Sequence, residues 1–434
     1  MRIVPDTWNA GIKIAALSDV GMRRANNQDA YATLPADSAE RFSRRGHLFV
    51  VADGMGAHAA GELASQMAAE KISQYYLKHS AVDATTALRL AVQEANSDIH
   101  RRGRENPEFF NMGTTASSIA ILPEGVIVAH VGDSRVYRLR DQKFEQLTFD
   151  HSLVWEMQAS GQVHPDSSLR HAIPKNVITR SLGPSEDVVV DIEGPFPAKK
   201  GDRYLLCSDG LSGQVADEEI GPILAALPPD QAARVLVDLA NLRGGPDNST
   251  LIIVQVTDLP VAATGRSNPG QAKSPVPWLI VATPIFCFVA AAALGLSGSI
   301  GPMVVAILLG IIAAVVAGLQ LRRLANESTV HDPVKKSVRS APYRTYSAKP
   351  NRELLDRLAG VLDALKKAAA ERGWTVDWSG VNSLTEEGQK ARERGDLLDA
   401  VARQSEAIIE TMSQLRAQHR RPTDDGHSRE SALD

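Results

Sequence analysis

The chain has 434 residues, more than one ordinary domain holds, so two or three folded units are expected. Its formal net charge of −4 and charged fraction of 23% give no global indication of a nucleic-acid-binding protein. The two cysteines, Cys207 and Cys287, lie far apart in different kinds of segment. This argues against a disulfide framework and favours a reducing compartment.

Residues 1–257 are predicted to form one domain of mixed α and β structure. Short runs rich in apolar and β-branched residues predict its strands. These runs are Ile12–Ser18, His47–Ala52, Thr115–Leu122, Val126–Val131, Val136–Leu139, Arg203–Cys207 and Thr250–Gln255. Two helices, at about 61–78 and 83–102, fall in succession between the second and third strands. This order favours an α+β architecture over an alternating parallel sheet.

A flexible linker is predicted at 258–275, where Pro, Ala, Gly and Ser predominate. From Ser274 to Leu321 no residue is charged, a run of 48. A single helix of that length would be about 72 Å long, against roughly 30 Å of membrane hydrocarbon. We therefore expect two transmembrane helices within 276–321, at about 276–296 and 302–321, joined by a Gly- and Ser-rich turn. The alternative is a helical hairpin buried in a soluble core.

The segment after this hairpin is predicted as a loop at 322–350, a helical tail at 351–420 and disorder at 421–434. The tail helices are expected at 351–372 and 384–419, with one apolar face marked by leucines such as Leu354 and Leu358. The stretch from Ala391 to Ile408 resembles a tetratricopeptide unit. One such unit is weak evidence, so a generic helical pair is preferred. Protein partners for the tail are a hypothesis only.

At several points in the sequence, an aspartate stands next to a glycine at the end of an apolar strand. Asp53 is followed by Gly54, Asp133 is preceded by glycine, and Asp209 is followed by glycine; Asp247 precedes the last predicted strand. A single Asp-Gly pair is usually a turn. Four at strand ends of one sheet system can converge, and hard divalent cations would then offset their mutual repulsion. Oxygen ligands without His or Cys favour magnesium or manganese.

An arginine stands near further polar groups in the segment Ser18–Asp29, and a guanidinium binds phosphate with paired hydrogen bonds. Together with the aspartates, this segment resembles the metal-dependent serine/threonine protein phosphatases of the PPM (type-2C) family, especially its bacterial branch. The resemblance runs from about Ile12 to Val256. It is carried in order by SDVGMRRANNQDA, VADGMGAHAAGELAS, GTTAS, VGDSRVYRLR, LTFDHSL, ITRSLG, LLCSDGLSG and GGPDNST.

The resemblance implies a four-layer α-β-β-α sandwich with a metal centre at one end. It implies that Asp53 bridges two metals and that the Gly54 carbonyl is a further ligand. Asp209 and Asp247 would complete the first site. A third, weaker metal in bacterial relatives would use Asp133 with Asp209. The supporting and substrate-binding roles fall on further residues: phosphate binding on Arg24, and nearby support on Asp29 and Asn248.

Two positions depart from the family pattern. Gln28 stands where the family usually has glutamate, which predicts weaker binding of the second metal. Eukaryotic relatives have a histidine at the position of Met55, whereas bacterial relatives share the methionine. His58 lies nearby and is a candidate supporting residue, although a loop histidine is more often a structural group.

The predicted reaction is hydrolysis of phosphoserine or phosphothreonine on proteins by a metal-activated water, with Mg²⁺ or Mn²⁺ as cofactor. Phosphoproteins and a serine/threonine kinase are the expected partners. The alternatives are a catalytically weak phosphatase fold that serves as a membrane-tethered sensing module, and a dinuclear nuclease or phosphodiesterase. Residues 1–30 lack an apolar signal sequence, and basic residues flank the uncharged run. A multi-pass protein of the cytoplasmic membrane is therefore expected, with both termini in the cytoplasm.

Overall fold

The computed structural model describes residues 10–56, 59–164, 167, 173–174, 177–259, 278–297, 300–328 and 340–419. Side chains at 278–285, 288 and 317–328 lie outside this description, as do most of the predicted linker and the predicted disordered segment 421–434. The chain divides into two compact units: Met1–Ala262 together with Ala341–Asp434, and Ala263–Ser340.

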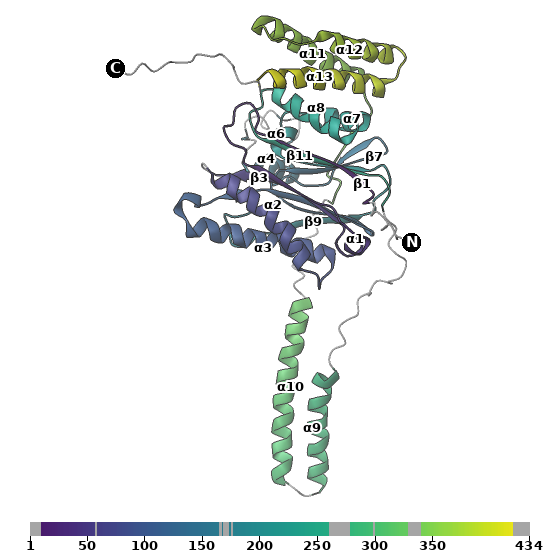
Figure 1. The fold of residues 1–434 in the computed structure, drawn as a ribbon. Coiled ribbons are helices and arrows are strands. Elements are labelled where there is room, and N and C mark those ends of the chain that lie inside the picture. The colour runs from purple at the N-terminus through teal and green to yellow at the C-terminus, as the bar shows by residue number, and fades with distance from the viewer. Residues whose placement is uncertain are drawn as a thin grey trace, which may run out of the picture. The chain divides into compact units, whose positions relative to one another are not determined.

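Two antiparallel sheets form the centre of the first unit (Figure 1). The first sheet has the order β1-β11-β10-β7-β8-β12. Its strands are β1 Ile12–Asp19, β7 Arg135–Arg140, β8 Lys143–Gln146, β10 Arg203–Cys207, β11 Ser249–Val256 and β12 Arg344–Ser347. The second sheet has the order β2-β3-β5-β6-β9, with β4 paired to β3. Its strands are β2 Asp29–Leu34, β3 His47–Met55, β4 Gly113–Thr114, β5 Ala116–Leu122, β6 Gly125–Val131 and β9 Asp191–Phe196.

The two sheets face each other across an apolar core that includes Phe49, Ile119, Leu206 and Ile252, all fully buried. Alternate side chains of a strand point to opposite faces, so each sheet has a second apolar face to cover. Helices α2 Ala60–Lys78 and α3 Ala84–Glu105 cover the second sheet. Helices α7 Asp217–Ala226 and α8 Pro229–Leu242 cover the first. The predicted α-β-β-α layers are therefore confirmed.

Shorter helices connect these layers. They are α1 Ala39–Arg45, a 3₁₀ turn at Pro107–Phe109, α4 Leu153–Ala159 and α6 Asp209–Ser212. Asp209 is the first residue of α6, and only Ser208 separates it from β10, so the change from strand to helix occurs beside a candidate metal ligand.

The helical tail belongs to the same compact unit as the phosphatase-like layers. It consists of α11 Arg352–Arg372, α12 Trp378–Glu393 and α13 Leu397–His419, and α13 packs against α7 and α8 as a further helical layer (Figure 1). Leu355, Leu358 and Ile408 of the tail share one buried cluster with residues of α7 and α8. A break at Gly395, whose φ is +82°, separates the two helices within the predicted helical stretch 384–419.

The predicted loop at 322–350 is wrong in two places. Helix α10 continues to Ser328, and Arg344–Ser347 form strand β12, which pairs antiparallel with β8. The reason is that without β12, β8 would be the edge strand of its sheet, with backbone groups free to pair with a further strand. Within this segment, residues 329–339 lie outside the described part.

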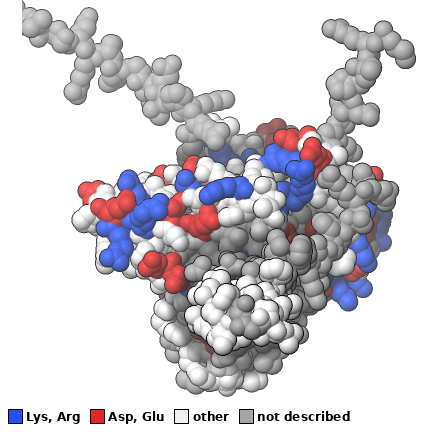
Figure 2. Space-filling model, turned by 90° about the horizontal axis from the view of Figure 1, so that it is seen from below, with Lys and Arg blue, Asp and Glu red and all other residues white. Residues whose placement is uncertain are grey.

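The second unit contains two helices close to the predicted positions, α9 Trp278–Leu296 and α10 Ile300–Ser328, which pack against each other. No helix in the part of the chain that the structure describes is long and apolar enough to cross a membrane. The predicted transmembrane hairpin is therefore not supported by the structure. In Figure 2, the end of this hairpin nearest the viewer shows no Lys, Arg, Asp or Glu among its described atoms.

Candidate metal centre

The pairing of β2 with β3 places the first two candidate carboxylates opposite each other. Asp29 begins β2 and is the direct register partner of Asp53 near the end of β3. The backbone of Asp53 is fixed by Thr115, whose hydroxyl accepts from the Asp53 N–H at 2.9 Å. The carbonyl of Asp53 accepts a hydrogen bond from the Thr115 N–H at 2.8 Å. These bonds hold the end of β3 in a single position.

Three further carboxylates come from ends of neighbouring strands. Asp133 follows β6, Asp209 follows β10 and Asp247 precedes β11. All three interact electrostatically with Asp53, as does Asp29. The five residues Asp29, Asp53, Asp133, Asp209 and Asp247 are hereafter called the carboxylate centre. Asp53 therefore lies close enough to each of the other predicted aspartates to feel its charge.

Burial and mutual repulsion raise the pKa values of these carboxyls. Burial raises the pKa of Asp53 well above its usual range, and the charges of Asp29 and Asp209 add to the effect. The pKa of Asp133 is about 7, because burial and the Asp209 charge outweigh the nearby Arg135. Burial also raises the pKa of Asp29 to about 6, against hydrogen bonds from Ser208 and Thr250. Burial and the charge of Asp247 raise the pKa of Asp209.

Two glycines allow the chain segments of the centre to approach closely. A Cβ at Gly54 would lie 2.0 Å from the Gly61 carbonyl oxygen and 2.5 Å from that of Gln28. A Cβ at Gly210 would lie 1.9 Å from the carbonyl oxygen of Asn248. Any side chain at either position would separate the strand ends, so the glycine beside each aspartate is required by packing.

Arg24 lies at the edge of the carboxylate centre. Its Nη2 donates to Asp247 Oδ2 at 2.7 Å, and about 45% of its side chain is exposed. Asn248 braces the same segment: its Oδ1 accepts from the Gln28 N–H at 2.8 Å, and its Nδ2 donates to the Val20 carbonyl at 2.9 Å. The predicted phosphate-binding and supporting residues therefore lie beside the predicted ligands.

Of the two remaining candidate supporting residues, Gln28 and His58, the structure describes only the first. Gln28 lies beside the centre, since its carbonyl accepts from the Gly54 N–H at 3.0 Å and its Nε2 lies 3.5 Å from the Gly56 carbonyl oxygen. His58 falls outside the described residues.

Sequence reasoning missed the polar groups behind the centre. Ser208 donates to Asp29 Oδ2 at 2.7 Å, and the hydroxyls of Thr115 and Ser134 lie 2.6 Å apart. Arg135 forms a paired hydrogen bond with Asp150, at 2.9 Å from Nε and 2.7 Å from Nη2 to Oδ2. Arg135 and Asp150 lie in two of the motifs that carry the family resemblance, which was the available signal. No spacing rule connects Arg135, on β7, with a loop residue 15 positions later.

The carboxylate centre fits a hard divalent cation by its chemistry. All its side-chain donors are oxygens, the kind that Mg²⁺ and Mn²⁺ prefer. Asp133 Oδ1 is buried and has no hydrogen-bond partner among the described residues, which is unusual for a carboxylate oxygen. In this arrangement, no group of three or more His, Cys, Asp or Glu side chains within the described ranges is positioned to hold a metal ion. Asp247 is directed to Arg24 instead.

Comparison with known proteins agrees with this geometry. Residues 22–237 match the family model described as Protein phosphatase 2C. The protein phosphatase PhpP of Streptococcus pneumoniae is 35% identical over 252 residues, which are 57% of this chain and 98% of PhpP. The crystal structure of the Mycobacterium tuberculosis serine/threonine phosphatase PstP/Ppp is similar with a TM-score of 0.51 and 35% identity. That match covers 57% of this chain and 99% of the PstP/Ppp chain.

A second crystal structure, of the catalytic domain of PstP in complex with two manganese ions, has 35% identity and a TM-score of 0.49. It covers 57% of this chain and 99% of the PstP domain. The chain belongs to the protein phosphatase 2C family, the metal-dependent serine/threonine protein phosphatases. The predicted enzyme class and the predicted use of Mg²⁺ or Mn²⁺ are confirmed at the level of this family.

Proposed function

We propose that this chain hydrolyses phosphoserine and phosphothreonine on other proteins at the carboxylate centre. The observation that carries the proposal is a cluster of buried carboxylates with an exposed arginine at its edge. Burial, with the charges of neighbouring acids added to it, raises the pKa values of Asp29, Asp53 and Asp133, and a bound divalent cation would offset both effects. A phosphatase needs this combination of a cation site and a phosphate-binding guanidinium.

Each residue has a separate role in this proposal. Asp53, the Gly54 carbonyl, Asp209 and Asp247 would hold the principal ions, and Asp133 with Asp209 would hold a further one. When bound, Mg²⁺ or Mn²⁺ supplies positive charge and lowers the pKa of water.

Arg24 has the substrate role, and its position explains how it performs it. Its guanidinium, half-exposed and held by Asp247, binds two oxygens of the substrate phosphate and offsets the charge that develops there during the reaction. Ser208 holds the Asp29 carboxylate in place, and Asn248 holds the backbone of Gln28.

Turnover of a phosphoserine peptide by the purified full chain with Mn²⁺ tests this proposal. We expect hydrolysis that EDTA abolishes and that Asp209→Ala removes, and we expect little activity on a phosphodiester. Absence of turnover in the presence of Mn²⁺ would favour a phosphatase-like sensing module. Preferential diester cleavage would favour a phosphodiesterase.

We further propose that the α9–α10 hairpin attaches the enzyme to the cytoplasmic membrane, with the phosphatase unit in the cytoplasm. The support is the uncharged run of 48 residues and the exposure of large apolar side chains: Phe286 is 74% exposed, Leu296 93% and Ile300 71%. The full chain should sediment with membranes and require detergent for extraction. Recovery in the soluble fraction, with no shift on replacing residues 276–321 by a Gly/Ser linker, would exclude this attachment.

The substrates proposed are phosphoproteins that a serine/threonine kinase modifies. A comparison of phosphopeptides between cells with and without this chain would identify them. An increase in phosphoserine and phosphothreonine peptides is expected on its removal. An unchanged phosphopeptide profile would exclude the assignment.

A further inference from the structure

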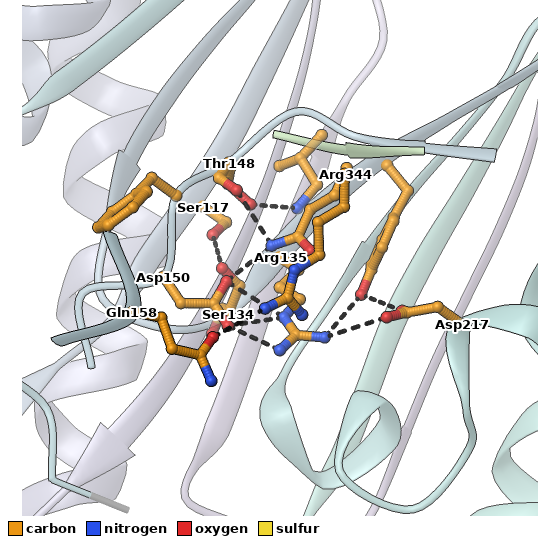
Figure 3. A network of polar contacts seen from close by, with 12 residues as sticks. Ser117, Ser134, Arg135, Thr148, Asp150, Gln158, Asp217 and Arg344 are labelled. Atoms are coloured by element: carbon orange, nitrogen blue, oxygen red, sulfur yellow. Dashed lines mark hydrogen bonds and ion pairs between the residues drawn. The ribbon is translucent and has the colours of Figure 1, made fainter. Parts of the chain in front are cut away.

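The C-terminal tail, taken from here on as Ala341–His419 so that it includes β12 and the three tail helices, packs against the segment behind Asp133. Strand β12 pairs with β8, with Arg344 in register with Gln146. Beside this pairing, the guanidinium of Arg344 lies over the ring of Trp155, with Cζ 3.9 Å from the ring centroid. Figure 3 shows Arg344 in one polar network with Arg135, Asp150 and Gln158. A residue from the end of the chain therefore contacts the network nearest to the carboxylate centre.

Helix α4 packs at this contact. Trp155 is the one buried residue of α4 in the described chain, so it is the side chain that anchors the helix. The ring of Trp155 is in contact with Phe149 edge-on at 5.3 Å between centroids, and Arg135 lies 5.9 Å from the Trp155 centroid. Arg344 covers Trp155 from the tail side and also donates to Gln158 at 3.5 Å.

Tyr343, which directly precedes Arg344, packs against Phe149, the ring that also contacts Trp155. Its ring meets Phe149 edge-on at 5.6 Å, and its hydroxyl donates to Glu193 Oε1 at 2.5 Å. The backbone N–H of Tyr343 donates to the Gln146 carbonyl at 2.9 Å. Phe149 is thereby fixed from the tail as well as from α4.

Phe149 is directly followed by the residues that hold the loop of Asp133. Asp150 accepts the paired hydrogen bond of Arg135, and Gln146 Nε2 donates to its Oδ1 at 2.7 Å. The backbone N–H of His151 donates to the Gly132 carbonyl at 2.7 Å, and the Gly132 N–H donates to His151 Nδ1 at 2.9 Å. A shift of Phe149 would be transmitted through these bonds to Gly132 and hence to its neighbour Asp133.

We propose that Arg344 is a positioning residue for the carboxylate centre: with Tyr343 it fixes Trp155 and Phe149, and through segment 149–151 it sets the place of Asp133. This inference rests on the proposed function. PhpP is matched over 98% of its length by 57% of this chain, so it has no counterpart to the tail. In this chain the tail therefore helps to position a residue of the metal centre and is not an independent module.

The test is Mn²⁺ binding by the full chain, measured as the loss of the free-ion electron paramagnetic resonance signal. The variants are Arg344→Gln and, as matched control, Arg357→Gln, which removes another tail arginine whose Nη1 lies 3.5 Å from Glu219, outside this network. We expect Arg344→Gln to raise the weakest Mn²⁺ dissociation constant by about three- to tenfold, while Arg357→Gln leaves it unchanged. Equal Mn²⁺ binding by the two variants would overturn the proposal.

A second readout separates positioning from stability. For Arg344→Gln, the Mn²⁺ concentration that gives half-maximal kcat should rise, while KM for the phosphopeptide stays within about twofold of wild type. Arg344→Lys keeps the charge but loses the planar stacking, so its Mn²⁺ binding should be intermediate, and it replaces Arg344→Gln if that variant does not fold. If Arg344→Gln does not fold and Arg344→Lys binds Mn²⁺ as tightly as wild type, Arg344 has a structural role only. Failure of the wild type to bind Mn²⁺ or to turn over would refute the proposed function instead.

Discussion

Buried carboxylates occupy two contrasting regions of this protein. In the carboxylate centre, acidic side chains face one another, and burial together with the neighbouring acids raises the pKa values of Asp53 and Asp133. In the network behind it, Asp150 is held by Arg135 through a paired hydrogen bond. Glu219 is held in the same way by Arg243 at 2.7 and 2.8 Å.

The partner of each acid determines which region it belongs to. Burial alone would raise the pKa of Glu219, but the hydrogen bonds and charge of Arg243 outweigh it and lower the pKa. Removing an acid that the fold pairs with arginine takes a partner from a buried charge, whereas an acid that the fold leaves beside other acids is available for a cation. Substitutions in the two regions should therefore have opposite consequences.

The largest effect is expected for Asp209→Asn in the carboxylate centre. Loss of this ligand should lower kcat/KM for a phosphoserine peptide by at least about a hundredfold. In EDTA the same change should raise the free energy of unfolding by about 1 kcal/mol, because it removes one of several repelling charges. Peptide hydrolysis and urea unfolding measure the two effects, and Asp230→Asn on the surface of α8 is the control. An active or strongly destabilised Asp209→Asn protein would contradict the comparison.

Asp150→Asn, in the second region, should show the reverse pattern. Removing the Asp150 charge leaves Arg135 with Asp217, 3.7 Å away, as its remaining acidic partner. The free energy of unfolding should therefore fall by about 3 kcal/mol, the low end for a broken buried ion pair. Urea unfolding in EDTA gives the value, with the exposed Asp187→Asn as the control. If Asp150→Asn were as stable as that control, the pair would not be a structural one.

Arg24→Ala is expected to weaken substrate recognition without weakening the fold. Loss of its charged hydrogen bonds to phosphate should reduce kcat/KM by about ten- to a hundredfold, and Arg24→Lys should recover only part of it. Steady-state kinetics on a phosphoserine peptide give the ratio. Full recovery by lysine would show that charge alone, without paired geometry, is required.

Stability should depend on pH with opposite sign at Asp133 and at Asp191. The pKa of Asp133 is about 7, above the usual 3.8, so its contribution is present below about pH 4 and is lost as the pH rises through 7. Asp191 is the opposite case: burial is outweighed by the hydrogen bond from His151, its pKa is about 2, and its contribution is lost as the pH falls from 4 to 2.

Urea unfolding in EDTA at a series of pH values measures this difference. Between pH 4 and 7, wild type should lose stability relative to Asp133→Asn. A difference that stays constant with pH would show that Asp133 titrates normally.

The smallest effect is expected for Gln28→Glu, which restores the acid that the family usually has. One more negative charge beside Gly54 should lower the Mn²⁺ concentration for half-maximal activity by about threefold. Gln66→Glu makes the same change on the exposed side of α2 and serves as the control. A rise, or an equal change in both variants, would contradict the role given to Gln28.

The same contrast explains what could be predicted from the sequence. Asp53, Asp133, Asp209 and Asp247 were predictable because each follows or precedes an apolar strand, and the order of motifs added the family. The seven predicted strands were predictable because apolar, β-branched residues crowd them. Arginine–carboxylate pairs have no periodicity, so the partner of Asp150 could not be chosen from the sequence.

The place of the tail was equally unpredictable. Arg344 is separated from Trp155 by 189 positions, with the apolar hairpin between them, and nothing in the short run Arg344–Ser347 specifies β8 as its neighbour. A strand that joins a sheet edge is chosen by backbone groups, which every residue carries. Loop was therefore the natural expectation for 322–350.

Anomalous diffraction from crystals of the full chain grown with Mn²⁺ tests the central claim most directly. The account predicts manganese peaks within coordination distance of Asp53, Asp209 and Asp247. It also predicts that the Arg24 guanidinium leaves Asp247 and points toward the place where the substrate phosphate binds. Peaks elsewhere, or none at a concentration that saturates activity, would show that the buried acids between the strand ends do not hold the catalytic ions.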